Sequence, residues 1–162
     1  MFELKPITKE GIPRALEKIE RYRLLNEPSE AESICRDILD VEPDHQKALV
    51  MLVLTLSDQF SHGTSAKEAT SLLKQLKDPY QKKYYQGIVL ERQAKAALNR
   101  RTPGSEHDAH EWLTEAMEAF EAAVAVRPSG NDDAILRWNA CVRTINRQKL
   151  SPRGKESEPV LE

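Results

Sequence analysis

The sequence predicts an all-α fold, and three observations support that prediction. Apolar residues recur three and four positions apart along most of the 162 residues, which is the period of an amphipathic helix. The alternation of apolar and polar residues that is typical of a strand is not sustained, and no Asn-Gly or Asp-Gly pair is present to close a β-hairpin. Prolines and capping residues interrupt the helical pattern often enough to predict about seven helices joined by short turns.

Composition places the chain among ordinary globular proteins. Hydrophobic residues make up 40% and charged residues 31%, and 162 residues suit one domain with a sizeable core. The net charge of -2 gives no general attraction to nucleic acid or anionic lipid. The longest apolar run, around residues 48–56, falls far short of the roughly 20 residues that span a bilayer. The first residues lack the apolar segment of a secretory signal.

The two cysteines, Cys35 and Cys141, are far apart in the sequence, and neither belongs to a CxxC motif. Both occupy apolar positions of a helical pattern, so we expect two reduced and buried side chains. This expectation favours a cytoplasmic location.

Prolines and capping residues set the expected boundaries in the first half of the chain. Pro13 suits an opening helical turn, where its missing N–H costs little, and Pro43 stops the second helix. Asp44 is expected to cap the third helix. The expected segments are a leader and three helices, at residues 1–11, 12–26, 28–43 and 44–56.

The second half has equally clear start signals. A loop at residues 58–64 is followed by Ser65 and Glu68, which have the spacing of a capping box. Asp78 precedes a proline at the start of a longer helix, and the stretch RRTPGS then breaks the pattern. Ser105, with an aspartate three residues on, is expected to cap the next helix. The four expected helices are residues 65–77, 79–99, 105–126 and 132–147.

Two short stretches share one spacing. In EAFEAAVAVRP, together with the residues just before it, small, aromatic, small and proline positions follow each other at four, three and five residues. An earlier stretch, EAESICRDILDVEP, repeats that spacing with apolar substitutes in the middle. The matching positions are Ala116, Phe120, Ala123 and Pro128, and Ala31, Cys35, Ile38 and Pro43. In this pattern the chain resembles the tetratricopeptide repeat family, whose unit is a helix-turn-helix of about 34 residues.

The resemblance implies a right-handed α-α superhelix in one domain, residues 12–147. Its expected parts are three helical hairpins and a capping helix, at residues 12–43, 44–77, 79–127 and 131–147, before a tail at 148–162 that we expect to be disordered. The spacing departs from the family, because Pro43 and Pro128 lie 85 residues apart whereas two units would span about 68. We therefore expect an irregular middle, with a degenerate second unit and an elongated third.

The resemblance also implies a function. Such repeats bind a peptide or partner helix in a concave groove lined by the first helix of each unit, so we expect a non-catalytic adaptor or scaffold with a protein partner. The implied groove residues are Lys47, Val50, Leu54, Lys82, Tyr85, Val89, Arg92, Asn139 and Arg143. The alternative for Val50, Leu54 and Val89 is that they are simply core. One branch of the family clamps a C-terminal carboxylate, but Leu16 and Glu20 replace its lysine and asparagine here, so we expect no such recognition.

Other kinds of chemistry have weaker signals. The motifs of zinc peptidases, phosphate-binding loops and nucleophile elbows are not present, so we expect neither an enzyme nor a cofactor. His107 and His110 share a helical face with Glu111, but zinc needs three or four ligands, and we expect a solvated helix start and no metal. Two alternatives stay open: self-association through the groove, and nucleic-acid contact by a basic run at Arg137, Arg143, Arg147, Lys149, Arg153 and Lys155.

Overall fold

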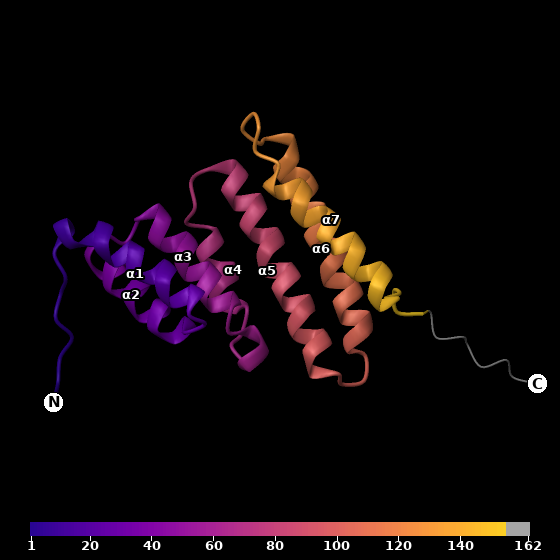
Figure 1. Ribbon diagram of the computed structural model, residues 1–162, viewed down its shortest axis with the longest axis horizontal. Helices are drawn as coiled ribbons and strands as arrows, with labels where there is room; N and C mark the ends of the chain where they lie inside the picture. The colour runs from indigo at the N-terminus through magenta and orange to yellow at the C-terminus, as the bar shows by residue number, and fades with distance from the viewer. Residues whose placement is uncertain (155–162) are drawn as a thin grey trace, which may run out of the picture.

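A computed structural model of the chain describes residues 1–154, and these contain seven α-helices, two 3-10 turns and no strand (Figure 1). The prediction of an all-α fold is therefore confirmed. The elements are η1 (Lys9–Gly11), α1 (Ile12–Leu24), α2 (Pro28–Val41), α3 (Gln46–Ser57), η2 (Phe60–His62), α4 (Lys67–Leu73), α5 (Pro79–Arg100), α6 (Ser105–Ala125) and α7 (Asp133–Gln148). Among the described helices, none combines the length and apolar character that crossing a membrane requires.

Helices that follow each other in the chain pack against each other. This holds for α1 with α2, α2 with α3, α3 with α4, α4 with α5, α5 with α6, and α6 with α7. In addition α3 contacts both α1 and α5. Figure 1 shows α1 to α4 at one end, α6 and α7 at the other, and α5 between them.

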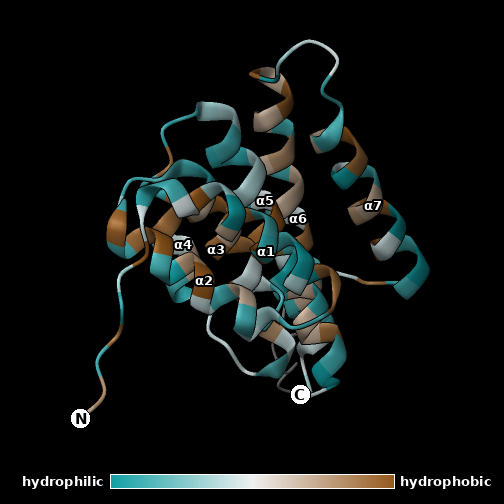
Figure 2. Cartoon of the chain, turned by 60° about the vertical axis from the view of Figure 1, so that its left-hand side comes forward, coloured by the Kyte–Doolittle hydropathy of each residue, from teal (hydrophilic) through white to brown (hydrophobic). Residues whose placement is uncertain are grey.

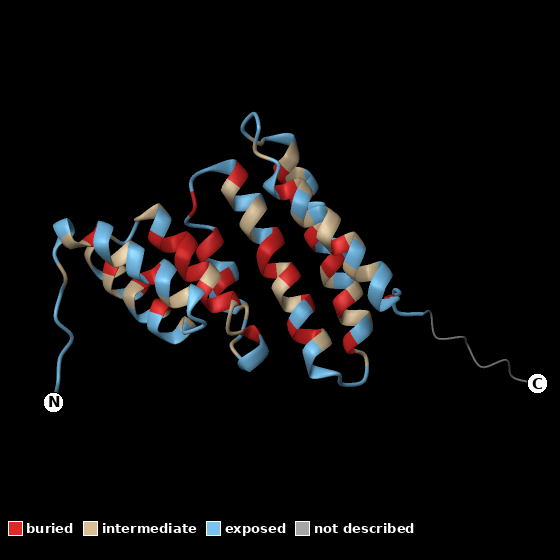
Figure 3. Ribbon diagram, viewed as in Figure 1, coloured by how far each residue is buried: buried red, intermediate tan, exposed pale blue. Residues whose placement is uncertain are grey.

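Two clusters of buried side chains hold the helices together, and α5 takes part in both. Val89 and Ala96 belong to the cluster built on α1 to α4, whereas Ile88, Ala94 and Ala97 belong to the cluster of α5, α6 and α7. Buried positions accordingly recur along the length of α5 in Figure 3. The first cluster centres on α3, which is hydrophobic along most of its length in Figure 2.

The two stripes that share one spacing are both fully buried. Ala31, Cys35 and Ile38 on α2, and Ala116, Phe120 and Ala123 on α6, all have 0% of their surface exposed. On the opposing helix, a Cβ atom added at Gly87 would lie 2.5 Å from Cε1 of Phe120. Small residues therefore permit close approach of paired helices, as the sequence predicts, and the aromatic ring of α6 fits because α5 has glycine opposite it.

Capping differs from the sequence expectation at several helix starts. His45, not Asp44, caps α3, because its Nδ1 atom accepts a hydrogen bond of 3.1 Å from the backbone N–H of Ala48. Ser65 accepts from the N–H of Lys67, but Glu68 binds Arg36 instead of completing a capping box. Helix α4 also ends at Leu73, short of the predicted Lys77. At α4, an ion pair with α2 thus takes the place of the local capping motif.

The cap predicted for α6 was wrong, whereas the one predicted for α5 was confirmed. Ser105 lies inside the first turn of α6, where its Oγ bonds to Thr102, and Gly104 occupies the cap position with φ 83°. Asp78 does cap α5, accepting from the N–H of Gln81. An aspartate directly before a proline thus proved a more dependable start signal than a serine near glycine.

The segment after α7 is packed, which corrects the expectation of disorder from residue 148. Helix α7 includes Gln148, and Leu150 is buried in the second cluster. Nδ1 of His107 lies 3.0 Å from the carbonyl oxygen of Ser151, and Arg153 forms an ion pair of 2.7 Å with Asp108. The remainder of the predicted tail, residues 155–162, lies outside the described residues.

Candidate binding groove between α1, α3 and α5

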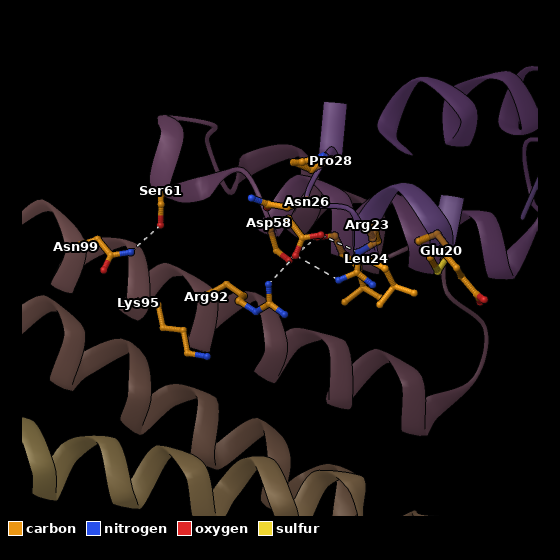
Figure 4. Close-up of a pocket in the computed structure, with 13 residues that line it drawn as sticks. Glu20, Arg23, Leu24, Asn26, Pro28, Asp58, Ser61, Arg92, Lys95 and Asn99 are labelled. Atoms are coloured by element: carbon orange, nitrogen blue, oxygen red, sulfur yellow. Dashed lines mark hydrogen bonds and ion pairs between the residues drawn. The ribbon is translucent and has the colours of Figure 1, made fainter. Parts of the chain in front are cut away.

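A hollow of about 730 Å³ opens between α1, α3 and α5; we call it the groove. Residues of all three helices, of the segments that follow α1 and α3, and of the start of α2 contribute to its wall (Figure 4). They are Glu20, Arg23, Leu24, Asn26, Pro28, Met51, Leu54, Ser57, Asp58, Ser61, Arg92, Lys95 and Asn99.

A smaller hollow of about 310 Å³ lies beside the groove, between α3, α5 and α7; we call it the side hollow. Its lining is Leu54, Tyr84, Tyr85, Ile88, Glu91, Arg92, Lys95 and Arg137. Leu54, Arg92 and Lys95 belong to both linings, so the two hollows form one continuous surface.

Asp58 is the centre of an ion triad in the groove. It follows the last residue of α3 and accepts hydrogen bonds of 2.7 Å from Arg23 Nε and from Arg92 Nη1 (Figure 4). A second bond of 3.2 Å from Arg23 makes that contact bidentate. Burial by itself would raise the pKa of Asp58, but the two guanidinium groups outweigh it, and the pKa is lowered. One carboxylate thereby joins α1, α3 and α5.

Glu91 forms a second ionic contact, between α5 and α7. Only 4% of its side chain is exposed, and both of its carboxylate oxygens accept from Arg137, the longer bond being 3.2 Å. Lys95 lies further away, at 3.8 Å. A buried carboxylate needs such a partner, because an unpaired charge in the interior is strongly destabilising. Arg137 therefore attaches the last helix to α5.

Tyrosines of α5 complete the far end of the side hollow. Tyr84 stacks on Tyr80 at 5.6 Å between ring centroids and meets Tyr85 edge-on at 5.0 Å. Burial, and then the negative charge of Asp133, raise the pKa of Tyr84 to about 12. The phenol is consequently neutral at physiological pH, so these rings contribute apolar surface and neutral hydroxyl groups.

The implied groove residues divide into three groups. Leu54 and Arg92 line both hollows, and Tyr85 lines the side hollow. Val50 and Val89 are buried at 7% and 2% exposure, which matches the alternative that they are core.

The rest lie elsewhere. Neither lining includes Lys47, Lys82, Asn139 or Arg143. Lys47 is exposed and pairs with Glu20 at 3.4 Å. On α7, Arg137 contacts Glu91 of α5. Asn139 and Arg143 occupy a different side of α7.

Several lining residues were not anticipated. Asp58 was expected in a loop, and Arg23, Lys95 and Arg137 lie on helix faces that carry ordinary surface charge. Helical periodicity reveals apolar stripes, but it does not indicate which charged side chains form ion pairs with residues about 35 positions away. The nearest clue to such a charged contact in the sequence is Glu91, an acidic residue at the end of the otherwise apolar stretch IVLE.

Chemistry outside the two hollows is limited in residues 1–154. These contain no cluster of three or more His, Cys, Asp or Glu side chains placed to hold a metal. Cys35 and Cys141 are free and buried, and burial raises the pKa of each thiol to about 12, so both stay protonated and weakly nucleophilic. In the basic run, Arg137 and Arg153 are already engaged in ion pairs.

In comparisons with known proteins, no family model, no curated protein sequence and no solved structure matches this chain.

Proposed function

We propose that the protein is a non-catalytic interaction module, an adaptor or scaffold that binds a peptide or helix of a protein partner in the groove. The observation that carries the proposal is the composition of the groove wall. Apolar side chains of Leu24, Met51 and Leu54 lie next to the charged groups of Arg92 and Lys95. Such a mixture suits a polypeptide, because side chains can be placed on the apolar part while charged groups fix orientation.

The proposed architecture is a short right-handed array of tetratricopeptide-like hairpins, with α7 as a terminal cap. Two features support it: the matching buried stripes on α2 and α6, and the packing of each helix on its neighbours in the chain. In such an array the first helices of successive units line one side, which is how α1, α3 and α5 are arranged around the groove.

The ion pairs support a preformed site. The triad at Asp58 and the contact between Glu91 and Arg137 join four helices around the two hollows. A rigid groove reduces the entropy lost when a partner binds, which favours affinity. We further propose a cytoplasmic location, which the two free buried thiols support.

A photo-crosslinking amino acid placed at Leu54 tests the proposed function. We expect it to link a partner protein in cells that express the chain, and the same amino acid at Val126 serves as control. Val126 is 51% exposed at the end of α6 and lies outside both hollow linings.

Substitution then has to remove the captured partner. Leu54→Glu and Lys95→Glu should each abolish its retention by the purified protein, whereas Val126→Glu should not. Circular dichroism confirms that the variants are folded. Equal retention by all three variants would contradict the proposal.

A further inference from the structure

The two hollows carry more positive than negative charge. Arg23 and Arg92 share the single carboxylate of Asp58. Both carboxylate oxygens of Glu91 accept from Arg137, which leaves Lys95 with a weak contact of 3.8 Å. Glu20, also in the lining, is balanced by Lys47. The surface thus has an excess of positive charge although the whole chain carries a net charge of -2.

This excess charge is accessible. The side chain of Lys95 is 51% exposed and that of Arg92 is 32% exposed. Within residues 1–154, Arg92 donates to Asp58 through Nη1, so its other N–H groups are available to a ligand. Lys95 and Arg92 are three positions apart on α5 and therefore share a face of that helix.

Apolar surface lies next to these cations. Leu24 is 88% exposed at the rim of the groove, and Leu54, half-buried, lies in the lining of both hollows. An exposed leucine beside two cations is matched by a ligand that has an acidic side chain and an apolar side chain close together.

We propose that the groove binds an acidic, extended peptide segment of a partner protein, with a Glu or Asp side chain placed between Arg92 and Lys95 and a neighbouring apolar side chain on Leu24 and Leu54. The inference rests on the proposed function and adds the chemical class of the partner. Charge-assisted hydrogen bonds from ammonium and guanidinium groups to a carboxylate are stronger than neutral ones, and like charge repels a basic peptide.

An NMR titration of the full chain tests this class. The probe is a short peptide of repeating Glu-Leu-Pro units, acetylated and amidated so that it carries no terminal charge; proline keeps it extended. In one matched peptide every Glu is replaced by Gln, and in a second every Glu is replaced by Lys. We expect the Glu peptide to shift backbone signals around Lys95, Arg92 and Asp58, and to bind about tenfold or more tightly than the Gln peptide. The Lys peptide should not bind.

A pair of variants locates the effect. Lys95→Glu should weaken binding of the Glu peptide by about tenfold or more, and Lys95→Arg should preserve it. Lys82→Glu is the matched control, since it makes the same charge change on the same helix at an exposed position outside both linings. It should leave the dissociation constant nearly unchanged.

Three results would overturn the inference: no shift with the Glu peptide, equal binding of the Gln peptide, or equal weakening by Lys82→Glu. If crosslinking at Leu54 still captures a partner, the proposed function stands and the acidic class alone is wrong. If neither the peptide binds nor a partner is captured, both proposals fail.

Discussion

The hairpin of α1 and α2 and the hairpin of α5 and α6 have the same stripe spacing but pack in different ways. The first uses helices of 13 and 14 residues and buries Cys35 and Ile38 at its middle positions. The second uses helices of 22 and 21 residues, with Phe120 set against Gly87. A stripe of small residues thus allows two helices to approach closely. The largest side chain in the stripe determines how small the residue opposite it on the other helix must be.

The same contrast extends to charge. The N-terminal helices meet α5 through a half-buried triad at Asp58, whereas α7 is attached to α5 by Glu91, a carboxylate with a 4% exposed side chain. Phe120 and Glu91 are thus large or charged buried groups of the C-terminal helices, and Cys35 and Asp58 are their counterparts in the N-terminal helices. Substitutions at these positions should separate the two cases.

The largest effect should come from Phe120→Ala. Removing a fully buried ring that fills the space beside Gly87 should lower the free energy of unfolding by about 4 kcal/mol. Cys35→Ala, at the matching position of α2, should cost about 1 kcal/mol. Urea denaturation followed by circular dichroism measures both. Similar losses at the two positions would show that the hairpins depend equally on this site.

A second effect should follow from Arg137→Ala. The substitution leaves the buried carboxylate of Glu91 without its bidentate partner and should cost about 3 kcal/mol. The matched control is Arg153→Ala, which removes an exposed ion pair with Asp108 and should cost below about 1 kcal/mol. Chemical denaturation of the two variants compares them. A loss at Arg137 as small as that at Arg153 would contradict a structural role for the buried pair.

The smallest effect concerns the triad. The folded-state pKa of Asp58 lies below its ordinary value of 3.8, so its contribution to stability is present above that pH and is lost as the pH falls through the folded-state value. Asp58→Asn should therefore reduce stability by about 1 kcal/mol at neutral pH. It should also flatten the decline in stability on acidification below about pH 4.

Unfolding curves from pH 6 to pH 2 measure this dependence in wild type and variant. The pKa of Glu68 is likewise lowered, by its hydrogen bond to Arg36, so Glu68→Gln serves as the comparison. Because Glu68 lies at an exposed pair outside the groove, its substitution should leave the contribution of Asp58 intact. If the stability of wild type and of Asp58→Asn declined with pH in the same way, the triad would not contribute to the pH dependence.

Much of the fold could be predicted from the sequence, whereas much of the groove could not. The helices could be predicted, because apolar periodicity and prolines act over a few residues. The buried stripes followed from the same local pattern. The cap at α3 could not be predicted, because Asp44 and His45 are both able to cap a helix and periodicity does not choose between them. The capping box at α4 was predicted wrongly, because Glu68 pairs with Arg36 of the neighbouring α2.

The sequence by itself determined that this chain forms helices, where most of them begin and end, and which small residues lie between paired helices. The tertiary structure decided which charged residues meet. Arg23, Asp58 and Arg92 come from separate segments, and Arg137, not Asn139 or Arg143, is the residue of α7 that lines the side hollow. The physical reason is that hydrophobic burial leaves a periodic trace along each helix. The rotation and crossing of helices, which bring charges together, depend on the packing of all their side chains at once.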